Sequence, residues 1–296
     1  MQRKFPVYGR IGLALTAAAW LLNSSLPGLR THLLFFPLWL GYILTVDALV
    51  FVRKGHSLFS RSWKHALLLF AFSAPVWWLF ELINLRTQNW VYLGREQFSW
   101  FSYFFFSTLN FSTVIPAVFE TAELAGTFRW IQHLRSGPRL HANRRMFVVG
   151  CFMLGLLLLF PRFFFPFVWL SLLCLIEPLN RRFGFSSLWA FWERGDWRPA
   201  VALGIGSLIC GFFWEMWNLH SFPKWIYQIP FFGFWKVFEM PLFGYLGYLP
   251  FALELFALYR LACGLLKIAP CDENPLTSSR TGNFQQTVPQ RIFWSG

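Results

Sequence analysis

Charged residues are scarce in this chain of 296 residues, and acidic residues are scarcer than basic ones. Asp, Glu, Lys and Arg make up 13% of the sequence, against 56% hydrophobic residues and 21% Phe, Trp and Tyr. A soluble domain does not need so apolar a composition, and its surface carries more charge. The apolar runs approach the ~20 residues that cross a bilayer, so the composition indicates an integral membrane protein.

Familiar catalytic and metal-binding patterns are also missing. The sequence contains no HExxH, GxSxG, P-loop or Rossmann glycine pattern. Its cysteines show no CxxC spacing and mostly fall inside apolar runs, so we interpret them as small buried residues. His220 has no second histidine nearby. We therefore expect no bound metal and no cofactor.

The hydrophobic runs predict an all-α integral membrane protein of about eight transmembrane helices. The expected spans are 10–24, 33–52, 65–84, 104–126, 146–161, 163–179, 199–218 and 242–266. After residue 268 the sequence turns polar, and we expect 269–296 to form a disordered cytoplasmic tail.

The basic residues are distributed unequally between the two sides that these spans define. With a cytoplasmic N-terminus, the outer segments carry only six of the 26 Lys and Arg: Arg30, Arg86, Arg95, Arg162, Lys224 and Lys236. This bias follows the positive-inside rule and predicts that both termini are cytoplasmic, in a bacterial cytoplasmic (inner) membrane. The same rule explains the formal charge of +13, so we expect no nucleic-acid partner.

One stretch of the sequence occurs twice. The run from Trp78 to Tyr92 resembles the run from Phe212 to Tyr227, with Glu81 matching Glu215 at a separation of 134 residues. Trp39 and Asp47 likewise match Trp169 and Glu177 at a separation of 130. Four spans per copy is an even number, so we expect two parallel four-helix repeats, 1–135 and 136–268, related by an axis near the membrane normal.

Carboxyl groups are the candidate catalytic residues, because a charge at membrane depth costs roughly 2.5–3.5 kcal/mol and therefore requires a partner or a function. Glu81 and Glu215 stand at equivalent positions near the outer ends of two spans. Glu120 and Glu254 form a second equivalent pair, each four residues after a proline. Glu239, in the outer loop of the second copy, has no acidic counterpart and makes an asymmetric site plausible.

Amide and aromatic residues beside these carboxyl groups are the candidate substrate-binding residues. They are Asn84, Trp90 and Tyr92 in the first copy and Trp214, Trp217, Asn218, His220, Trp225 and Tyr227 in the second. An aromatic belt at the membrane interface also explains the tryptophans and tyrosines, but it does not explain the glutamates. Since each Glu–Asn pair shares one helical face, we expect both pairs to face the protein interior and the amide to satisfy the carboxyl group.

Three functions fit this pattern. The first is an enzyme that acts on a lipid or isoprenoid-like substrate, in which a carboxyl group in a site of low dielectric serves as a general acid and tryptophan faces shelter a cation. The second is a proton- or ion-coupled transporter, in which the carboxyl groups form a relay across the membrane. The third is a structural or lipid-interacting membrane protein, so the sequence leaves open whether the chain is an enzyme. In each case the expected partner is a membrane lipid or a hydrophobic small molecule, and the oligomeric state stays open.

The predicted topology can be tested by labelling single cysteines introduced at Gln88 and Lys224 in a cysteine-free background. Both positions lie in outer loops of the predicted topology, so both should react with an impermeant maleimide added to intact cells. Reaction of either position only from the cytoplasmic side would contradict the topology.

Overall fold

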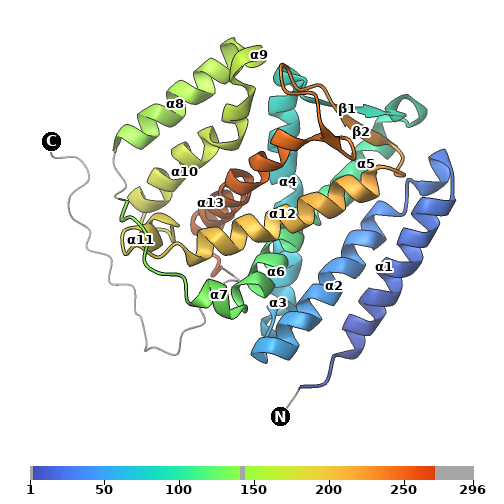
Figure 1. The fold of residues 1–296 in the computed structure, drawn as a ribbon, viewed down its shortest axis with the longest axis horizontal. Helices are drawn as coiled ribbons and strands as arrows, with labels where there is room; N and C mark the ends of the chain where they lie inside the picture. The colour runs from blue at the N-terminus through green and yellow to red at the C-terminus, as the bar shows by residue number, and fades with distance from the viewer. Residues whose placement is uncertain (1–2, 141–143, 271–296) are drawn as a thin grey trace.

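The computed structural model describes residues 3–140 and 144–270 and is mainly helical (Figure 1). The first half contains α1 (Val7–Ser25), α2 (Phe35–Lys54), α3 (Leu58–Arg61), α4 (Trp63–Thr87), β1 (Trp90–Leu93), α5 (Trp100–Phe111), α6 (Val114–Gly126) and α7 (Arg129–Gln132). The second contains α8 (Arg144–Leu159), α9 (Pro161–Phe164), α10 (Ser171–Arg182), α11 (Trp189–Trp192), α12 (Arg198–Asn218), β2 (Lys224–Tyr227), β3 (Lys236–Val237), β4 (Met240–Pro241) and α13 (Tyr248–Leu266). Short 3-10 helices lie at Gly28–Thr31, Arg95–Gln97, Phe165–Trp169 and Leu242–Gly247.

Five helical segments of the described chain are long and apolar enough to cross a membrane. They are Phe35–Lys54, Trp63–Thr87, Trp100–Gly126, Arg198–Asn218 and Leu242–Leu266, and a bent pair, Pro161–Trp169 with Ser171–Arg182, makes a sixth if it counts as one span. The other two expected spans fall on α1, which is outside this group, and on α8, whose apolar part Arg145–Leu159 is shorter. The fold therefore agrees with a helical membrane protein.

Local sequence signals fix the ends of α4, the helix that carries Glu81. Its first turn begins at Ser62, whose hydroxyl accepts a hydrogen bond from the backbone N–H of His65. Its last turn ends at Gln88, which adopts a left-handed conformation with φ of 52° and donates its N–H to Asn84 O. This sharp end turns the chain directly into strand β1, so the strand lies beside the last turn of the helix.

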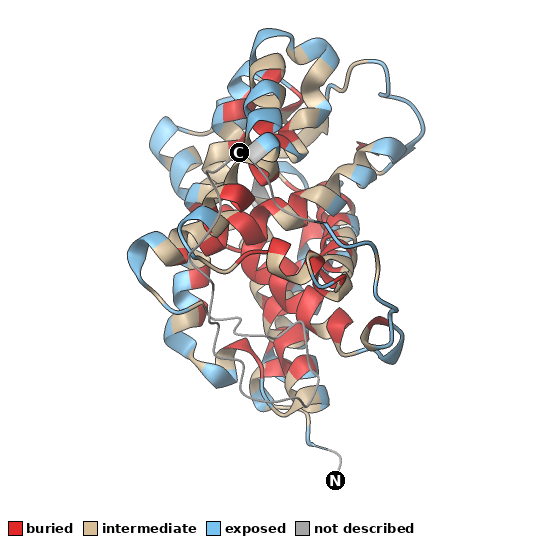
Figure 2. Cartoon of the chain, turned by 90° about the vertical axis from the view of Figure 1, so that its left-hand side faces the viewer, coloured by how far each residue is buried: buried red, intermediate tan, exposed pale blue. Residues whose placement is uncertain are grey.

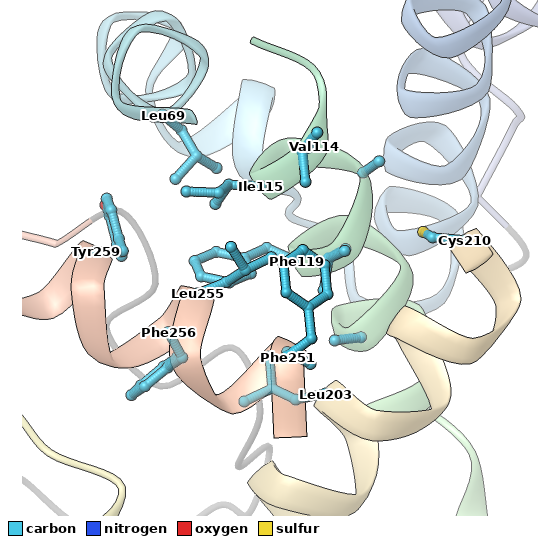
Figure 3. Close-up of a cluster of buried hydrophobic side chains, with 14 of the residues drawn as sticks. Leu69, Val114, Ile115, Phe119, Leu203, Cys210, Phe251, Leu255, Phe256 and Tyr259 are labelled. Carbon is cyan, nitrogen blue, oxygen red and sulfur yellow. The ribbon is translucent and has the colours of Figure 1, made fainter. Parts of the chain in front are cut away.

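The buried core lies between α4, α6, α12 and α13, with α1 and α2 on one side and α8 and α10 on the other (Figure 1). Exposed residues concentrate at the periphery and buried residues at the centre (Figure 2). Figure 3 shows one part of this core, in which Phe119 of α6 meets Phe256 and Tyr259 of α13. Apolar side chains from both halves of the sequence thus fill one common core.

Helix α12 of the second half packs closely on α6 of the first half at Gly206. A Cβ atom at Gly206 would lie 2.6 Å from the backbone nitrogen of Ala122 and 2.9 Å from the carbonyl oxygen of Val118. Backbone atoms cannot move aside as the end of a flexible side chain can. Glycine at this position therefore permits the approach that brings the end of α12, with Glu215, toward the elements of the first half.

The sequence predicted an all-α architecture, but the described residues also form two short two-stranded antiparallel sheets. Strand β1 pairs with β2, and β3 pairs with β4. The sequences Trp-Val-Tyr in β1 and Trp-Ile-Tyr in β2 alternate aromatic and β-branched residues, which favours an extended strand. The predicted cytoplasmic tail lies outside the described residues except for its first two positions, 269 and 270.

Candidate functional site

Three aromatic side chains hold the carboxyl group of Glu81 near the C-terminal end of α4. Oε1 of Glu81 accepts hydrogen bonds from the indole N–H groups of Trp77 and Trp90, each at 3.0 Å, and from the Tyr92 hydroxyl at 2.5 Å. All three donors are neutral. Because three donors converge on one oxygen, that oxygen acts only as an acceptor, as a carboxylate oxygen does.

Two tyrosines hold the equivalent carboxyl group of Glu215, which is fully buried near the end of α12. Its Oε1 accepts from the hydroxyls of Tyr227 at 2.7 Å and Tyr248 at 2.9 Å. The Trp225 indole N–H donates to the Tyr227 oxygen at 3.0 Å. Among the described residues, Oε2 of Glu215 is buried and has no hydrogen-bond partner. The two oxygens of this carboxyl group therefore have different surroundings, since only Oε1 receives hydrogen bonds.

The two asparagines fasten the strands to the helix ends and do not bind the glutamates as the sequence analysis expected. Asn84 donates to Trp90 O at 2.8 Å, and its own oxygen accepts the N–H groups of Asn89 and Trp90. Asn218 donates to Trp225 O at 2.7 Å and accepts the Trp225 N–H at 2.9 Å. The prediction that Glu–Asn pairs satisfy each other is wrong, because the backbone of the following strand uses both ends of each amide.

Strands β1 and β2 bring the two clusters together. Trp90 lies opposite Tyr227, Val91 opposite Ile226, and Tyr92 opposite Trp225. The pairing is symmetric between the two halves of the sequence. Residues 90, 91 and 92 match residues 225, 226 and 227, each 135 positions later, and exchanging the matched residues gives the same three pairs. Side chains alternate between the two faces of a strand, so the Trp and Tyr residues share one face of the ribbon, while Val91 and Ile226 occupy the other.

A cavity of about 140 Å³ lies against this aromatic face. Its wall is made largely of aromatic side chains: Phe35, Trp77, Trp90, Tyr92, Phe98, Tyr103, Phe106, Phe111, Trp169, Trp214, Phe222, Trp225, Tyr227, Tyr248 and Phe251. His32, Ser107, Asn110 and Ser221 supply its polar side chains. Glu81 and Glu215 do not line the cavity. The side chains that hydrogen bond to them do, so each carboxyl group stands one residue behind the wall.

The tyrosines between the carboxyl groups and the cavity keep their protons. Burial raises the pKa of Tyr92 well above the ordinary value of a phenol, and the charge of Glu81 raises it further. Burial and the charge of Glu215 act in the same way on the pKa of Tyr227. Both phenols are therefore neutral donors at physiological pH, and each of these cavity-lining residues donates its hydroxyl to a carboxyl group.

The two clusters differ in the side chain that completes them. Position 211 corresponds to Trp77, but it is a glycine, and a Cβ atom there would lie 2.4 Å from the Tyr248 ring. Tyr248, whose counterpart is Val114, fills this space and donates to Glu215. The donor that is not shared by the two clusters thus comes from α4 in the first cluster and from α13 in the second. The sequence alignment could not identify this exchange, because neither position matches its counterpart.

Several predicted site residues lie away from the cavity. Glu120 and Glu254 are buried in α6 and α13, where Glu254 Oε1 accepts the backbone N–H of Leu173 at 3.2 Å. Glu239 forms an ion pair with Lys224 at 2.5 Å. The predicted catalytic roles of Glu120, Glu254 and Glu239 therefore find no support in their position relative to the cavity wall.

Two predicted substrate-binding residues are also outside the wall. Trp217 packs on the buried Trp39, with ring centroids 4.9 Å apart, and His220 is exposed. Five of the predicted substrate-binding residues do line the cavity: Trp90, Tyr92, Trp214, Trp225 and Tyr227. Within the described residues, no group of His, Cys, Asp and Glu is arranged to hold a metal ion.

Sequence analysis missed three wall residues that matter for the geometry. Trp77 and Tyr248 donate to the glutamates, and Trp169 stacks on Trp90 with ring centroids 6.3 Å apart. Trp169 carried a signal, since it matches Trp39 in the alignment of the two halves. Trp39 packs on Trp214 while Trp169 packs on Phe80, and these two partners are themselves equivalent positions.

The anchoring role of Asn218 leads to a prediction about the local stability of β2. Asn218→Asp keeps the acceptor but removes the donor to Trp225 O. This loss should destabilise the paired strands β1 and β2 by about 1–3 kcal/mol. Hydrogen–deuterium exchange of the peptide containing Trp225 should rise in Asn218→Asp, with a smaller rise for the peptide containing Trp90, since β1 pairs with β2 but keeps its own anchor, Asn84. Unchanged exchange at Trp225 would show that the amide does not anchor the strand.

No protein-family model, curated protein or solved structure matches this chain. Its function must therefore be argued from the arrangement of the cavity and the two carboxyl clusters.

Proposed function

We propose that this protein is a membrane-embedded enzyme that binds a lipid or isoprenoid-like molecule in the aromatic cavity and acts on it by carboxyl acid–base chemistry. The observation that carries the proposal is the contact from Glu215 through the Tyr227 hydroxyl to the cavity wall, with Tyr248 as a second contact. A wall so rich in aromatic rings suits an apolar ligand. The carboxyl group behind it supplies the proton donor and acceptor that chemistry on such a ligand requires.

The arrangement supports a proton relay. When the proton of Glu215 is on Oε1, the oxygen that contacts Tyr227, it passes to the Tyr227 oxygen while the Tyr227 hydroxyl gives its own proton to a carbon of a substrate double bond. The π electrons form the new C–H bond, a cation remains on the neighbouring carbon, and Glu215 becomes a carboxylate. Loss of a proton from an adjacent carbon through the same relay restores the acid and leaves an isomerised or cyclised alkene. Positioned acid–base groups of this kind contribute about 10²–10⁴-fold to a rate.

Aromatic faces stabilise the cation during this cycle. The negative face of a Trp or Tyr ring attracts a positive charge within ~6 Å of its centroid, by about 2 kcal/mol when water is excluded. Trp214, Trp225 and Tyr248 lie on the Glu215 side of the cavity, and Trp77 and Trp90 lie on the Glu81 side. A cation formed beside Glu215 would thus have rings around it and a carboxylate behind the wall.

The proposal includes a duplicated chain of two parallel four-helix copies with both termini in the cytoplasm of a bacterial cell. Matching hydrogen bonds support the duplication. Asp47 accepts from the Ser57 hydroxyl and the Phe59 N–H, while Glu177 accepts from the Ser187 hydroxyl and the Trp189 N–H. In both halves the donors stand ten and twelve residues after the acid. Such acids fasten the following short helix, α3 or α11, in each copy.

Proton-coupled transport is the second candidate, and Glu120 is the observation that favours it. Its side chain is 1% exposed, and its Oε2 has no hydrogen-bond partner among the described residues. It lies on α6 six residues beyond Val114, a cavity-lining residue, which corresponds to ~9 Å along a helix. A relay between the cavity and the opposite side of the membrane would pass such a group.

The effect of Glu215→Gln distinguishes these functions. Cells that lack the gene and carry the wild-type chain should differ from empty-vector cells in at least one extractable lipid or isoprenoid. Glu215→Gln keeps the shape but removes the titratable proton, so it should lower formation of that product about 10²-fold or more. Glu81→Gln should have a smaller effect, because its carboxyl group lacks the second tyrosine donor.

Glu96→Gln is the matched control, since Glu96 is an exposed outer residue and should leave the product unchanged. The thermal stability of each purified variant shows whether it folds. An extract that does not respond to the wild-type chain, or equal tolerance of Glu81→Gln and Glu215→Gln by folded proteins, would contradict the proposed enzyme. Transport would be favoured if vesicles that contain the Glu120→Gln variant lose the proton uptake of wild-type vesicles while the extractable lipids of the cells stay unchanged.

A further inference from the structure

We propose that the cavity selects ligands with a permanently cationic centre that has no N–H groups, such as the quaternary ammonium group of an amphiphile. This inference rests on the proposed function, because it assumes that the cavity binds a lipid-like molecule. The recognised property of such a molecule would be its permanent positive charge. Three features of the wall and its surroundings support it.

The first feature is the density of aromatic rings. Fifteen of the 24 residues that line the cavity are Phe, Trp or Tyr. Aromatic cages of this composition are the usual recognition element for quaternary ammonium groups, since each ring face attracts the diffuse positive charge. Five of the rings are tryptophans, which provide the strongest attraction. An uncharged apolar ligand gains no comparable benefit from aromatic over aliphatic walls.

The second feature is a pair of acidic groups, one on each side of the cavity, that form no ion pair within the described residues. Glu81 and Glu215 receive hydrogen bonds from neutral Trp and Tyr donors, and neither takes part in an ion pair within the described chain. The ion pairs that do form use Glu123, Glu193, Asp196 and Glu239. In its ionised form, an acid behind the wall is stabilised by a positive charge nearby. A cation in the cavity would lie one aromatic residue away from Glu81 and from Glu215.

The third feature is the shortage of acceptors on the wall. A primary ammonium group needs three acceptors to replace its water, and a metal ion needs several oxygen or nitrogen ligands. The polar side chains of the wall are His32, Ser107, Asn110 and Ser221, outside the tyrosine hydroxyls. Of the tyrosine oxygens, that of Tyr227 already accepts the indole N–H of Trp225. A quaternary ammonium group needs no hydrogen bonds, so it matches this wall better than either alternative.

The inference also fits the proposed acid–base step. A carbocation formed from an alkene and a quaternary ammonium group share a positive charge on a centre without hydrogen-bond donors. An enzyme binds a stable mimic of its charged intermediate more tightly than it binds the neutral substrate. Quaternary ammonium amphiphiles would therefore occupy the cavity either as ligands in their own right or as mimics of that intermediate.

A pair of isosteric probes tests the inference on the purified full chain in a nonionic detergent. Hexanoylcholine carries a trimethylammonium group, and 3,3-dimethylbutyl hexanoate carries a neutral tert-butyl group in its place. Binding is followed by the intrinsic tryptophan fluorescence of the protein. Hexanoylcholine should bind at least tenfold more tightly than the neutral ester. Glu215→Gln should remove most of this preference while it leaves the affinity for the neutral ester unchanged, and Glu96→Gln should behave as the wild type.

Equal affinities for the two probes would overturn the cation selectivity and would leave the proposed lipid-binding cavity standing. Failure of both probes to bind a folded protein would overturn the cavity as a binding site and the proposed function with it. A second variant, Trp225→Leu, separates ring attraction from charge. This variant should lower the affinity for hexanoylcholine more than the affinity for the neutral ester. An equal loss of affinity for both probes would contradict the role of the Trp225 ring.

Discussion

The structure depends on the hydrogen bonds that hold two glutamates, Glu215 buried and Glu81 half-buried, near the ends of α12 and α4. A carboxyl group in an apolar interior is destabilising by several kcal/mol unless donors surround it. Here the donors are phenol and indole groups of residues that line the neighbouring cavity, and they donate to one oxygen of each carboxyl group. The acids therefore impose the position of the aromatic wall, and the wall in turn excludes water from the acids.

The asparagines and the two-stranded ribbon convert this local requirement into a joint between the two halves of the chain. Asn84 binds the backbone of Trp90, the first residue of β1, and Asn218 binds the backbone of Trp225, the second residue of β2. The two strands then pair with one another. Because the strands alternate, all four Trp and Tyr side chains lie on the cavity side. The cavity is thus built at the contact between halves, where a difference such as Gly211 with Tyr248 makes one side chemically distinct from the other.

Sequence reasoning predicted the helical membrane class and five of the cavity-lining aromatics, and it matched Glu81 with Glu215, which both accept a tyrosine hydroxyl in the structure. These features depend on composition and on short local patterns, which a single sequence displays directly. It misassigned the asparagines, because helical spacing places Asn84 on the face of Glu81 but says nothing about the strand that returns along that face. It could not locate Tyr248 or Trp77 as donors, since each fills a space that exists only after the helices have packed. Glu239 looked important because it is acidic, and only the fold shows Lys224 beside it.

The central claim is that the aromatic cavity holds an apolar molecule, and mass spectrometry of organic extracts from the purified protein tests it most directly. The variant Ser107→Trp places an indole on the cavity wall, whereas Ser102→Trp changes the same helix, α5, away from the wall. The wild type and Ser102→Trp should both release one apolar compound in near-stoichiometric amount that Ser107→Trp lacks. Extracts that contain only bulk membrane lipid in the wild type, or the same compound in all three proteins, would contradict the account.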